Sequence, residues 1–152
     1  MAIKTVWSEG SLDHVPERYR PLAKFAYPVS YGLFAIVFGL YGAVSGGSAS
    51  VNAVSVSWYP HVLCALVGIA ALTSLVGLVF LRKEVELTGE ALLVAFSTMY
   101  LILLFVALGT GAGAPVAAAT TTAVVIVLLG IRGYDLLFEI TQRKMAGGDE
   151  RQ

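Results

Sequence analysis

Three glutamates near the middle of the chain form the densest group of side chains that could perform acid–base chemistry. Glu84, Glu86 and Glu90 lie in the segment RKEVELTGE, directly after Arg82 and Lys83. Paired carboxylates can act as a general acid and a general base. Because the segment lies between two apolar runs and mixes cations with anions, we expect a solvated loop with local ion pairs. The pattern therefore favours a polar connection over a catalytic pair.

The two histidines and the single cysteine offer little further chemistry. His14 belongs to a polar head and His61 to an apolar run, so a haem held by both within one chain is disfavoured. No set of Cys, His, Asp and Glu has metal-ligand spacing. We expect an interfacial hydrogen-bonding role for His61 and an inert packing role for Cys64. No cofactor, no metal and no enzymatic activity are predicted, because no nucleophile, base or metal set converges at one depth.

The composition indicates that lipid surrounds most of the chain. Of 152 residues, 57% are hydrophobic and 13% are charged, and the mean hydropathy is +0.79. Soluble domains are about 45–50% apolar and about 25% charged. The formal net charge is zero, which gives no global attraction to nucleic acid. The composition therefore predicts an integral membrane protein whose main partner is the lipid bilayer.

Four apolar runs predict the elements that hold these side chains. Each run approaches the roughly 20 residues that a helix needs to cross about 30 Å of hydrocarbon, and backbone groups in lipid must be satisfied within helices. The expected fold is all-α, an integral membrane four-helix bundle over 27–140. A polar and basic head precedes it at 1–26, with two interpretations open, a short interfacial helix or an irregular basic anchor, and a cytoplasmic tail follows at 141–152. The expected spans are about 27–45, 58–81, 91–109 and 115–133, the last with an amphipathic extension.

The distribution of cations predicts the orientation. All ten Lys and Arg residues lie before the first run, between the second and third, or at and after the end of the fourth. Because basic segments remain in the cytoplasm, both termini are expected there, an N-in/C-in topology. Aromatic and basic side chains are expected to anchor the spans at the membrane interfaces, with Arg132 reaching the headgroups from a helix end. These anchors are Lys24, Tyr27, Trp58, Tyr59, Arg82, Lys83 and Arg132.

Small residues recur at helical spacing in the first two runs. Gly42 and Gly46 form a GxxxG pattern, and close helix approach in lipid depends on such residues. Two interpretations stay open: packing among the helices of one chain, or self-association into a homo-oligomer. The expected helix-packing residues are Ala35, Gly39, Gly42, Gly46, Cys64, Gly68, Ala70 and Ser74.

Hydroxyl groups form two modest patches within the apolar runs. Ser97, Thr98 and Tyr100 lie in the third run, and Thr120 to Thr122 lie in the fourth. They either bond to backbone carbonyls or line a narrow aqueous path in an assembly. No carboxylate or base is predicted within the hydrocarbon, and this disfavours a proton-coupled transporter, which usually carries an intramembrane ionisable residue.

The layout resembles that of small four-span membrane proteins encoded by bacteriophages of actinobacteria. The resemblance lies in the head with PERYRP, the span YPVSYGLFAIVFGLYG and the hairpins with short outer loops. It implies a location in the bacterial cytoplasmic membrane and a holin-like role, in which copies accumulate and open lesions. Familiar holins have one to three spans, and here Asp149 and Glu150 dilute the basic tail. Two alternatives remain: an accessory or exclusion protein that binds another membrane protein, and a small transporter or channel.

Overall fold

The computed structural model describes residues 5–8, 17, 20–111 and 116–149. In that part of the chain every regular element is a helix, as predicted. Four helical stretches are long and apolar enough to cross a membrane: Lys24–Ser45, Tyr59–Val79, Lys83–Gly109 and Val116–Gln142. The elements in chain order are η2 (Leu22–Ala26), α1 (Tyr27–Phe34), η3 (Ala35–Gly42), α2 (Ala43–Ser45), α3 (Ala49–Val54), α4 (Tyr59–Val79), α5 (Lys83–Gly109) and α6 (Val116–Asp149).

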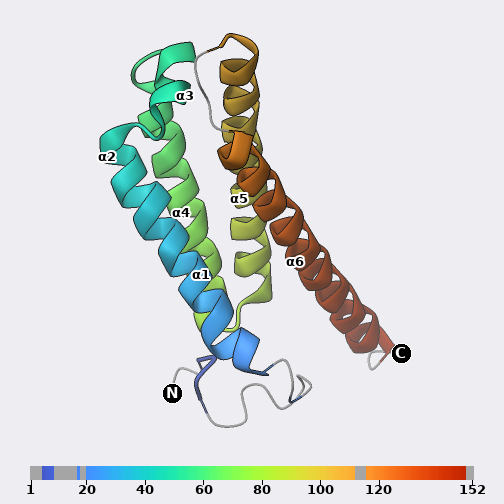
Figure 1. Ribbon diagram of the computed structural model, residues 1–152. Helices are drawn as coiled ribbons and strands as arrows, with labels where there is room; N and C mark the ends of the chain where they lie inside the picture. The colour runs from blue at the N-terminus through green and yellow to red at the C-terminus, as the bar shows by residue number, and fades with distance from the viewer. Residues whose placement is uncertain (1–4, 9–16, 18–19, 112–115, 150–152) are drawn as a thin grey trace.

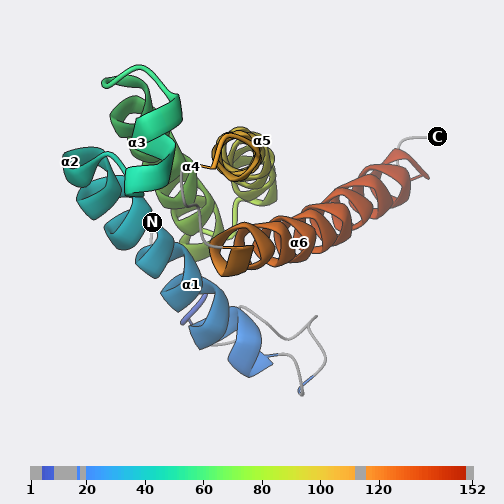
Figure 2. The same ribbon diagram turned by 45° about the horizontal axis from the view of Figure 1, so that its top comes forward.

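The helices form a bundle from which the last one diverges. The first stretch, from η2 to α2, packs along α4, and α4 packs along α5. Helix α6 packs against α5 and then slants away towards its C-terminal end (Figure 1). The view in Figure 2 shows the same divergence of α6 from α1 and α4. Residues 5–8 and the C-terminal end of α6 lie at one end of the bundle, which we call the inner end.

A tight turn joins α4 to α5 at the inner end. Leu81 adopts a left-handed backbone conformation with φ of 56°, and the amide of Arg82 donates to the carbonyl of Gly77 at 2.7 Å. Such a bond satisfies a carbonyl that the end of α4 leaves without a partner. Helix α5 therefore starts at Lys83, several residues before the predicted start of the third span at 91.

The predicted Ser/Gly turn at the outer end contains a short helix. Gly46, at φ of 74°, ends α2 in the left-handed region. The hydroxyl of Ser48 accepts from the amide of Val51 and caps α3. The amide of Ser48 donates to the hydroxyl of Tyr100 at 3.3 Å, which ties this connection to α5.

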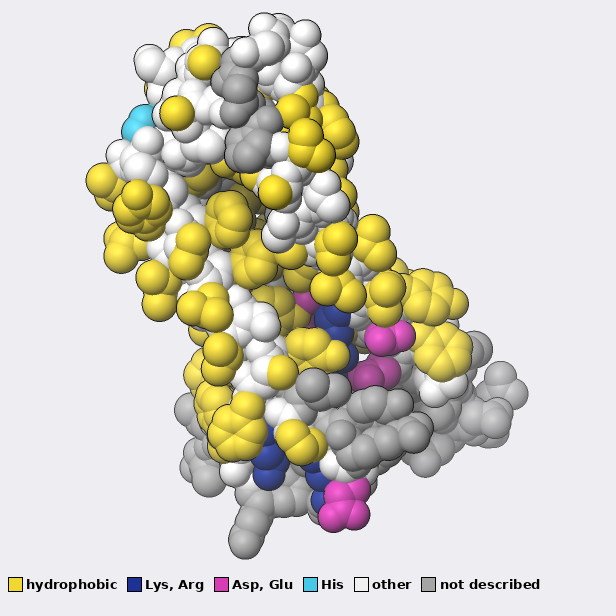
Figure 3. Space-filling view, viewed as in Figure 1, with side chains coloured by type: hydrophobic (Ala, Val, Ile, Leu, Met, Phe, Trp, Pro, Cys, Tyr) yellow, Lys and Arg dark blue, Asp and Glu magenta, His cyan; other side chains and the backbone are white. Residues whose placement is uncertain are grey.

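Two hydrophobic clusters lie along the bundle. The inner one joins the first stretch, α4 and α5 around Tyr31, Val67, Ala70, Ala71, Leu78 and Leu93. The outer one joins α3, α5 and α6 around Val51, Leu104, Ala107 and Ala119. Large apolar side chains also cover the outer surface, as expected of helices that face lipid (Figure 3).

Part of the N-terminal head docks onto the inner end. Val6 is fully buried, and its amide donates to the carbonyl of Val79 at 2.9 Å. The indole of Trp7 donates to the carbonyl of Lys24 at 3.1 Å. The segment expected to hold an interfacial helix is 11–25, of which 11–16 and 18–19 lie outside the described residues and 22–25 belong to η2.

Candidate functional site: a buried polar cluster beside a cleft

Two of the three glutamates are buried within a helix, so the predicted solvated loop is wrong. Glu86 and Glu90 lie in α5, inside the third membrane-capable stretch, and are 0% and 1% exposed. At a spacing of four residues they share one face of the helix. Only Glu84, at the start of α5, remains exposed. The same observation places two carboxylates within a helix that is long and apolar enough to cross a membrane, next to the predicted span at 91–109.

Close approach of α4 explains why these carboxylates are buried. A Cβ atom added at Gly77 would lie 2.2 Å from the backbone nitrogen of Glu86. One added at Gly89 would lie 2.4 Å from the backbone nitrogen of Ser74. Glycine at 77 and 89 therefore brings the backbones of α4 and α5 together on either side of the glutamates. Glu84 and Glu86 also lie in the first turn of α5, where a negative charge is favourable to the helix dipole.

Each buried glutamate has one partner from another helix. Arg132 of α6 donates from a terminal guanidinium nitrogen to Oε1 of Glu86 at 2.7 Å. The hydroxyl of Tyr31 on α1 donates to Oε1 of Glu90. The guanidinium of Arg132 also lies over the ring of Tyr27, 4.7 Å from its centre. We call Tyr31, Glu86, Glu90 and Arg132 the polar cluster.

The position of Arg132 differs from the prediction. It was expected at a helix end, with its side chain reaching the headgroups. The structure places it within α6, which continues to Asp149, and pairs it with a buried carboxylate. The other predicted anchors lie at helix ends or next to them, at Lys24, Tyr27, Trp58, Tyr59, Arg82 and Lys83.

The polar cluster keeps unused hydrogen-bonding capacity. Among the described residues, Oε2 of Glu86, Oε2 of Glu90 and Nε of Arg132 are buried without a partner in the protein. Two carboxylates also face one guanidinium, so full ionisation leaves an excess of one negative charge. Buried polar atoms are normally satisfied, and an exception points to a bound species or a functional role.

A cavity of about 380 Å³ lies beside the polar cluster, between α1, α5 and α6. Its wall includes Tyr27, Ser30 and Tyr31 of α1, Glu90 of α5, and Arg132 and Asp135 of α6. Acidic and basic side chains on the face shown in Figure 3 gather in its lower half, between apolar surfaces. We call this space the inner cavity. Three members of the polar cluster, Tyr31, Glu90 and Arg132, therefore border a volume in which a small species can bind.

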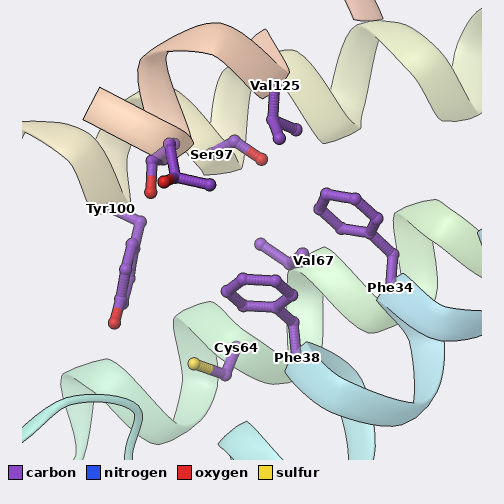
Figure 4. A pocket seen from close by; sticks show the side chains of 9 residues that line it. Phe34, Phe38, Cys64, Val67, Ser97, Tyr100 and Val125 are labelled. Atoms are coloured by element: carbon purple, nitrogen blue, oxygen red, sulfur yellow. The ribbon is translucent and has the colours of Figure 1, made fainter. Parts of the chain in front are cut away.

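A second cavity, of about 200 Å³, continues towards the outer end; we call it the outer cavity (Figure 4). Phe34 and Val125 line both spaces, so the two are neighbours. The rings of Phe34 and Phe38 stack with centres 5.2 Å apart, and Tyr100 meets Phe38 edge-on at 6.3 Å. The outer cavity is therefore largely aromatic and aliphatic.

The predicted hydroxyl patches divide between the two expected roles. The hydroxyls of Thr98, Thr120, Thr121 and Thr122 each donate to the carbonyl four residues earlier in their own helix. Thr121 and Thr122 nonetheless line the outer cavity, together with Ser97 and Tyr100.

The predicted packing residues meet one another within the chain. A Cβ atom at Gly68 would lie 2.2 Å from Cα of Gly39, and one at Gly42 would lie 2.9 Å from Sγ of Cys64. Ser74 faces Gly89, and Gly46 faces the ring of His61. Ala70 is buried in the inner cluster, against which Ala35 packs. These contacts join the first stretch to α4, and α4 to α5.

His61 and Cys64 take part in local structure. Nδ1 of His61 lies 2.7 Å from the carbonyl oxygen of Ala43, and Cys64 is a buried free thiol. No group of three or more His, Cys, Asp and Glu side chains among the described residues is placed to hold a metal ion.

One signal in the sequence points to the polar cluster. The third apolar run, 91–109, is short for a span, so the helix must extend over flanking residues. Extension towards the N-terminus carries Glu90 and Glu86 onto the helix, with Gly89 at a position of close approach. The partners Tyr31 and Arg132 lie 59 and 46 residues away from Glu90 and Glu86, respectively, and no local pattern pairs them.

Comparison with known proteins adds no relative. No protein-family model, curated protein or solved structure matches the chain. The architecture of the chain is therefore the available guide to its function. Its described residues form four helices long and apolar enough to cross a membrane, with a buried polar cluster beside the inner cavity.

Proposed function

We propose that this protein is a small membrane transport protein in which Glu90 binds and releases a proton as a cation passes. The observation that supports the proposal is the buried carboxylate of Glu90, whose Oε2 has no partner and which lines the inner cavity. The role is binding and translocation, without covalent chemistry. The sequence disfavoured a transporter because no ionisable residue was expected within the spans. The buried Glu90 in a membrane-capable helix is such a residue and favours the transporter over the other two functions.

The energetics of charge in lipid favour this role. An uncompensated carboxylate in a low-dielectric environment costs several kcal/mol. Arg132 already pairs with Glu86, so Glu90 must gain a proton or meet another cation. Tyr31 supplies one hydrogen bond but no charge. A site that alternates between a proton and a cation satisfies Glu90 in both states, which is the chemical basis of exchange.

The proposed orientation places this site near the cytoplasm. The described cations Lys24, Arg82 and Lys83 lie at the inner end, as do both ends of the described chain. Basic segments favour the cytoplasmic side, which supports N-in/C-in. Reporter fusions at Ser50 and after Gln152 should report opposite compartments, and a shared compartment would overturn the orientation.

Transport by reconstituted protein tests the proposal. Vesicles containing the protein, acidic inside and loaded with a pH-sensitive dye, receive sodium, potassium or tetraphenylphosphonium outside. At least one of these cations should raise the internal pH faster than in protein-free vesicles. Glu90→Gln should abolish that response because its amide holds no exchangeable proton, whereas the exposed Glu84→Gln should retain it. Equal responses from wild type and Glu90→Gln to all three cations would refute the proposal.

A second candidate is the holin-like role, which requires lateral association with copies of the chain. The observation in its favour is the small share of α6 that packs within the bundle: 6% of its most apolar window is buried, against 50% for α4. Inducible expression in bacteria should then collapse the membrane potential, and crosslinking should trap oligomers. An unaffected potential with a crosslinked foreign membrane protein would favour the accessory role instead.

A further inference from the structure

We infer that the inner and outer cavities, which together we call the cleft, bind a lipophilic monovalent cation. Its charge lies at Glu90 and its apolar body lies in the aromatic outer cavity. The inference rests on the proposed transport function and names its substrate class. It joins two observations from different parts of the cleft: an unpartnered buried carboxylate at one end and an aromatic wall at the other.

The two cavities are neighbours with part of their walls in common. Phe34 and Val125 belong to the walls of both. The inner cavity, at about 380 Å³, is within the range of small-molecule sites, and the outer one adds about 200 Å³. A ligand that reaches from Glu90 past Phe34 would therefore contact both the charge and the aromatic rings, of which Figure 4 shows Phe34, Phe38 and Tyr100.

The charge around Glu90 selects a cation. The groups beside Glu90 in the wall of the inner cavity are Tyr27 and Tyr31 from α1, and Arg132 and Asp135 from α6, and Glu86 from α5 is the partner of Arg132. With Glu90 they carry three carboxylates and one guanidinium, and Arg132 is already bound to Glu86. Glu90 lines the inner cavity, and its Oε2, on a side chain that is 1% exposed, has no partner in the protein.

The wall of the outer cavity selects an apolar ligand over a metal ion. A hard metal ion requires a shell of about six oxygen ligands, and the described residues contain no group of three suited to one. Phe34, Phe38 and Val67 instead present ring and aliphatic surfaces. Aromatic faces attract cations, most strongly where water is excluded, and a cation with a large apolar body loses little hydration on entry.

The rim of the cleft gives such a ligand access from the bilayer. Ser30 of α1 and Leu128 and Ile131 of α6 line the inner cavity and are also exposed on the outer surface of the bundle. Figure 2 shows that α6 diverges from α1, so in a membrane this rim would be open to the surrounding lipid. Lipophilic cations concentrate in the membrane and thus reach the site laterally.

Binding of the cation is coupled to release of a proton from Glu90, so that one positive charge leaves when another arrives. In the unloaded state Glu90 holds a proton; when the cation arrives, the O–H bond breaks and the proton leaves to water at the inner end. The carboxylate then pairs with the cation, so one positive charge replaces another and no electron is transferred. The net charge of the site is the same in both states, and the carboxylate of Glu90 is never left without a positive partner, which keeps the cost in lipid low.

Equilibrium binding to the purified full-length protein tests the inference with tetraphenylphosphonium as the probe. Glu90→Gln should abolish saturable binding. Phe38→Leu should weaken it about 2- to 30-fold through loss of the aromatic face, and Phe105→Leu, at an exposed position on the outside of α5, should leave it unchanged. Tetraphenylborate, which has the same shape and the opposite charge, should not bind when tested alone.

The outcomes separate this inference from the proposed function. Proton movement driven by sodium or potassium and dependent on Glu90, without saturable tetraphenylphosphonium binding, would refute the substrate class and leave the transport proposal intact. Equal binding of tetraphenylphosphonium by wild type and Glu90→Gln would also refute it. Size-exclusion profiles and thermal unfolding of every variant show whether a loss of binding comes from misfolding, and a misfolded Phe38→Leu is replaced by Val67→Ala.

Discussion

Two interfaces between helices of the bundle, which we call seams, are built in opposite ways. Along the seam between α4 and α5, glycines bring the backbones so close that an added Cβ at Gly77 would lie 2.2 Å from the neighbouring backbone. Along the seam that α6 makes with α5 and α1, long polar side chains bridge the helices, and Arg132 spans the distance to Glu86. The first seam leaves no space at Gly77 and Gly89, and only its outer part borders a cavity, through α4 residues such as Val67 and α5 residues such as Tyr100; the second seam borders both cavities.

The difference indicates which part of the molecule can move. Helices in direct backbone contact cannot separate without loss of all their packing contacts. Side-chain bridges can break and form again at a lower cost, and α6 diverges from the bundle (Figure 1). Rigid support on one side of Glu90 and an adjustable helix on the other suit a site that must open to exchange its ligand.

The largest expected loss of stability comes from removal of the ion pair between Arg132 and Glu86. Arg132→Met leaves Glu86 buried without its charged partner, and the loss of one member of a buried pair typically costs about 3–5 kcal/mol of unfolding free energy. Chemical or thermal unfolding in detergent measures it. Arg82→Met, at an exposed arginine before α5, is the matched control and should change stability little.

The double variant sharpens the same test. When Glu86→Met accompanies Arg132→Met, neither charge remains buried, and most of the lost stability should return. If the double variant is as unstable as Arg132→Met alone, the side chains hold the seam by their shape and not by their pairing.

A smaller effect is expected where the close-packed first stretch meets α4. Gly68→Val places a side chain against the backbone of Gly39, because its Cβ would lie 2.2 Å from Cα of that residue. Overpacking of this kind costs about 1–3 kcal/mol. Gly130→Val on α6, where nothing lies within 4 Å of the added Cβ, should be tolerated. Equal losses for the two variants would show that close approach does not distinguish the two parts of the bundle.

The sequence predicted the close-packed regions better than the bridged one. The number of apolar runs, their helical nature and the positions of the small residues all follow from local composition, because lipid imposes the same requirement on every span. The start of α5 was missed because a run of charged residues favours a loop when only hydropathy is considered. The turn at Leu81 and the glycine contacts of α4 provide the burial that overrides this preference.

The pairing within the polar cluster was beyond local pattern. Glu86 and Arg132 meet because α6 crosses α5 at one particular height, and Tyr31 reaches Glu90 because the first stretch packs on α4. Both depend on the tertiary arrangement of helices. The sequence supplied the residue types, and the structure supplied the juxtaposition that turns them into a candidate site.

The smallest expected effect comes from a second ion pair along the seam of α6. Lys83 lies 3.0 Å from Glu139, but the carboxylate side chain is 39% exposed, so solvent screens the pair. Lys83→Gln should therefore cost about 1 kcal/mol or less, and high salt should remove the difference from wild type. The loss caused by Arg132→Met should persist in salt, because that pair is buried. A salt-resistant loss for Lys83→Gln, as large as that for Arg132→Met, would mean that α6 packs on α5 along its whole inner half, and the contrast between a rigid and an adjustable seam would not hold.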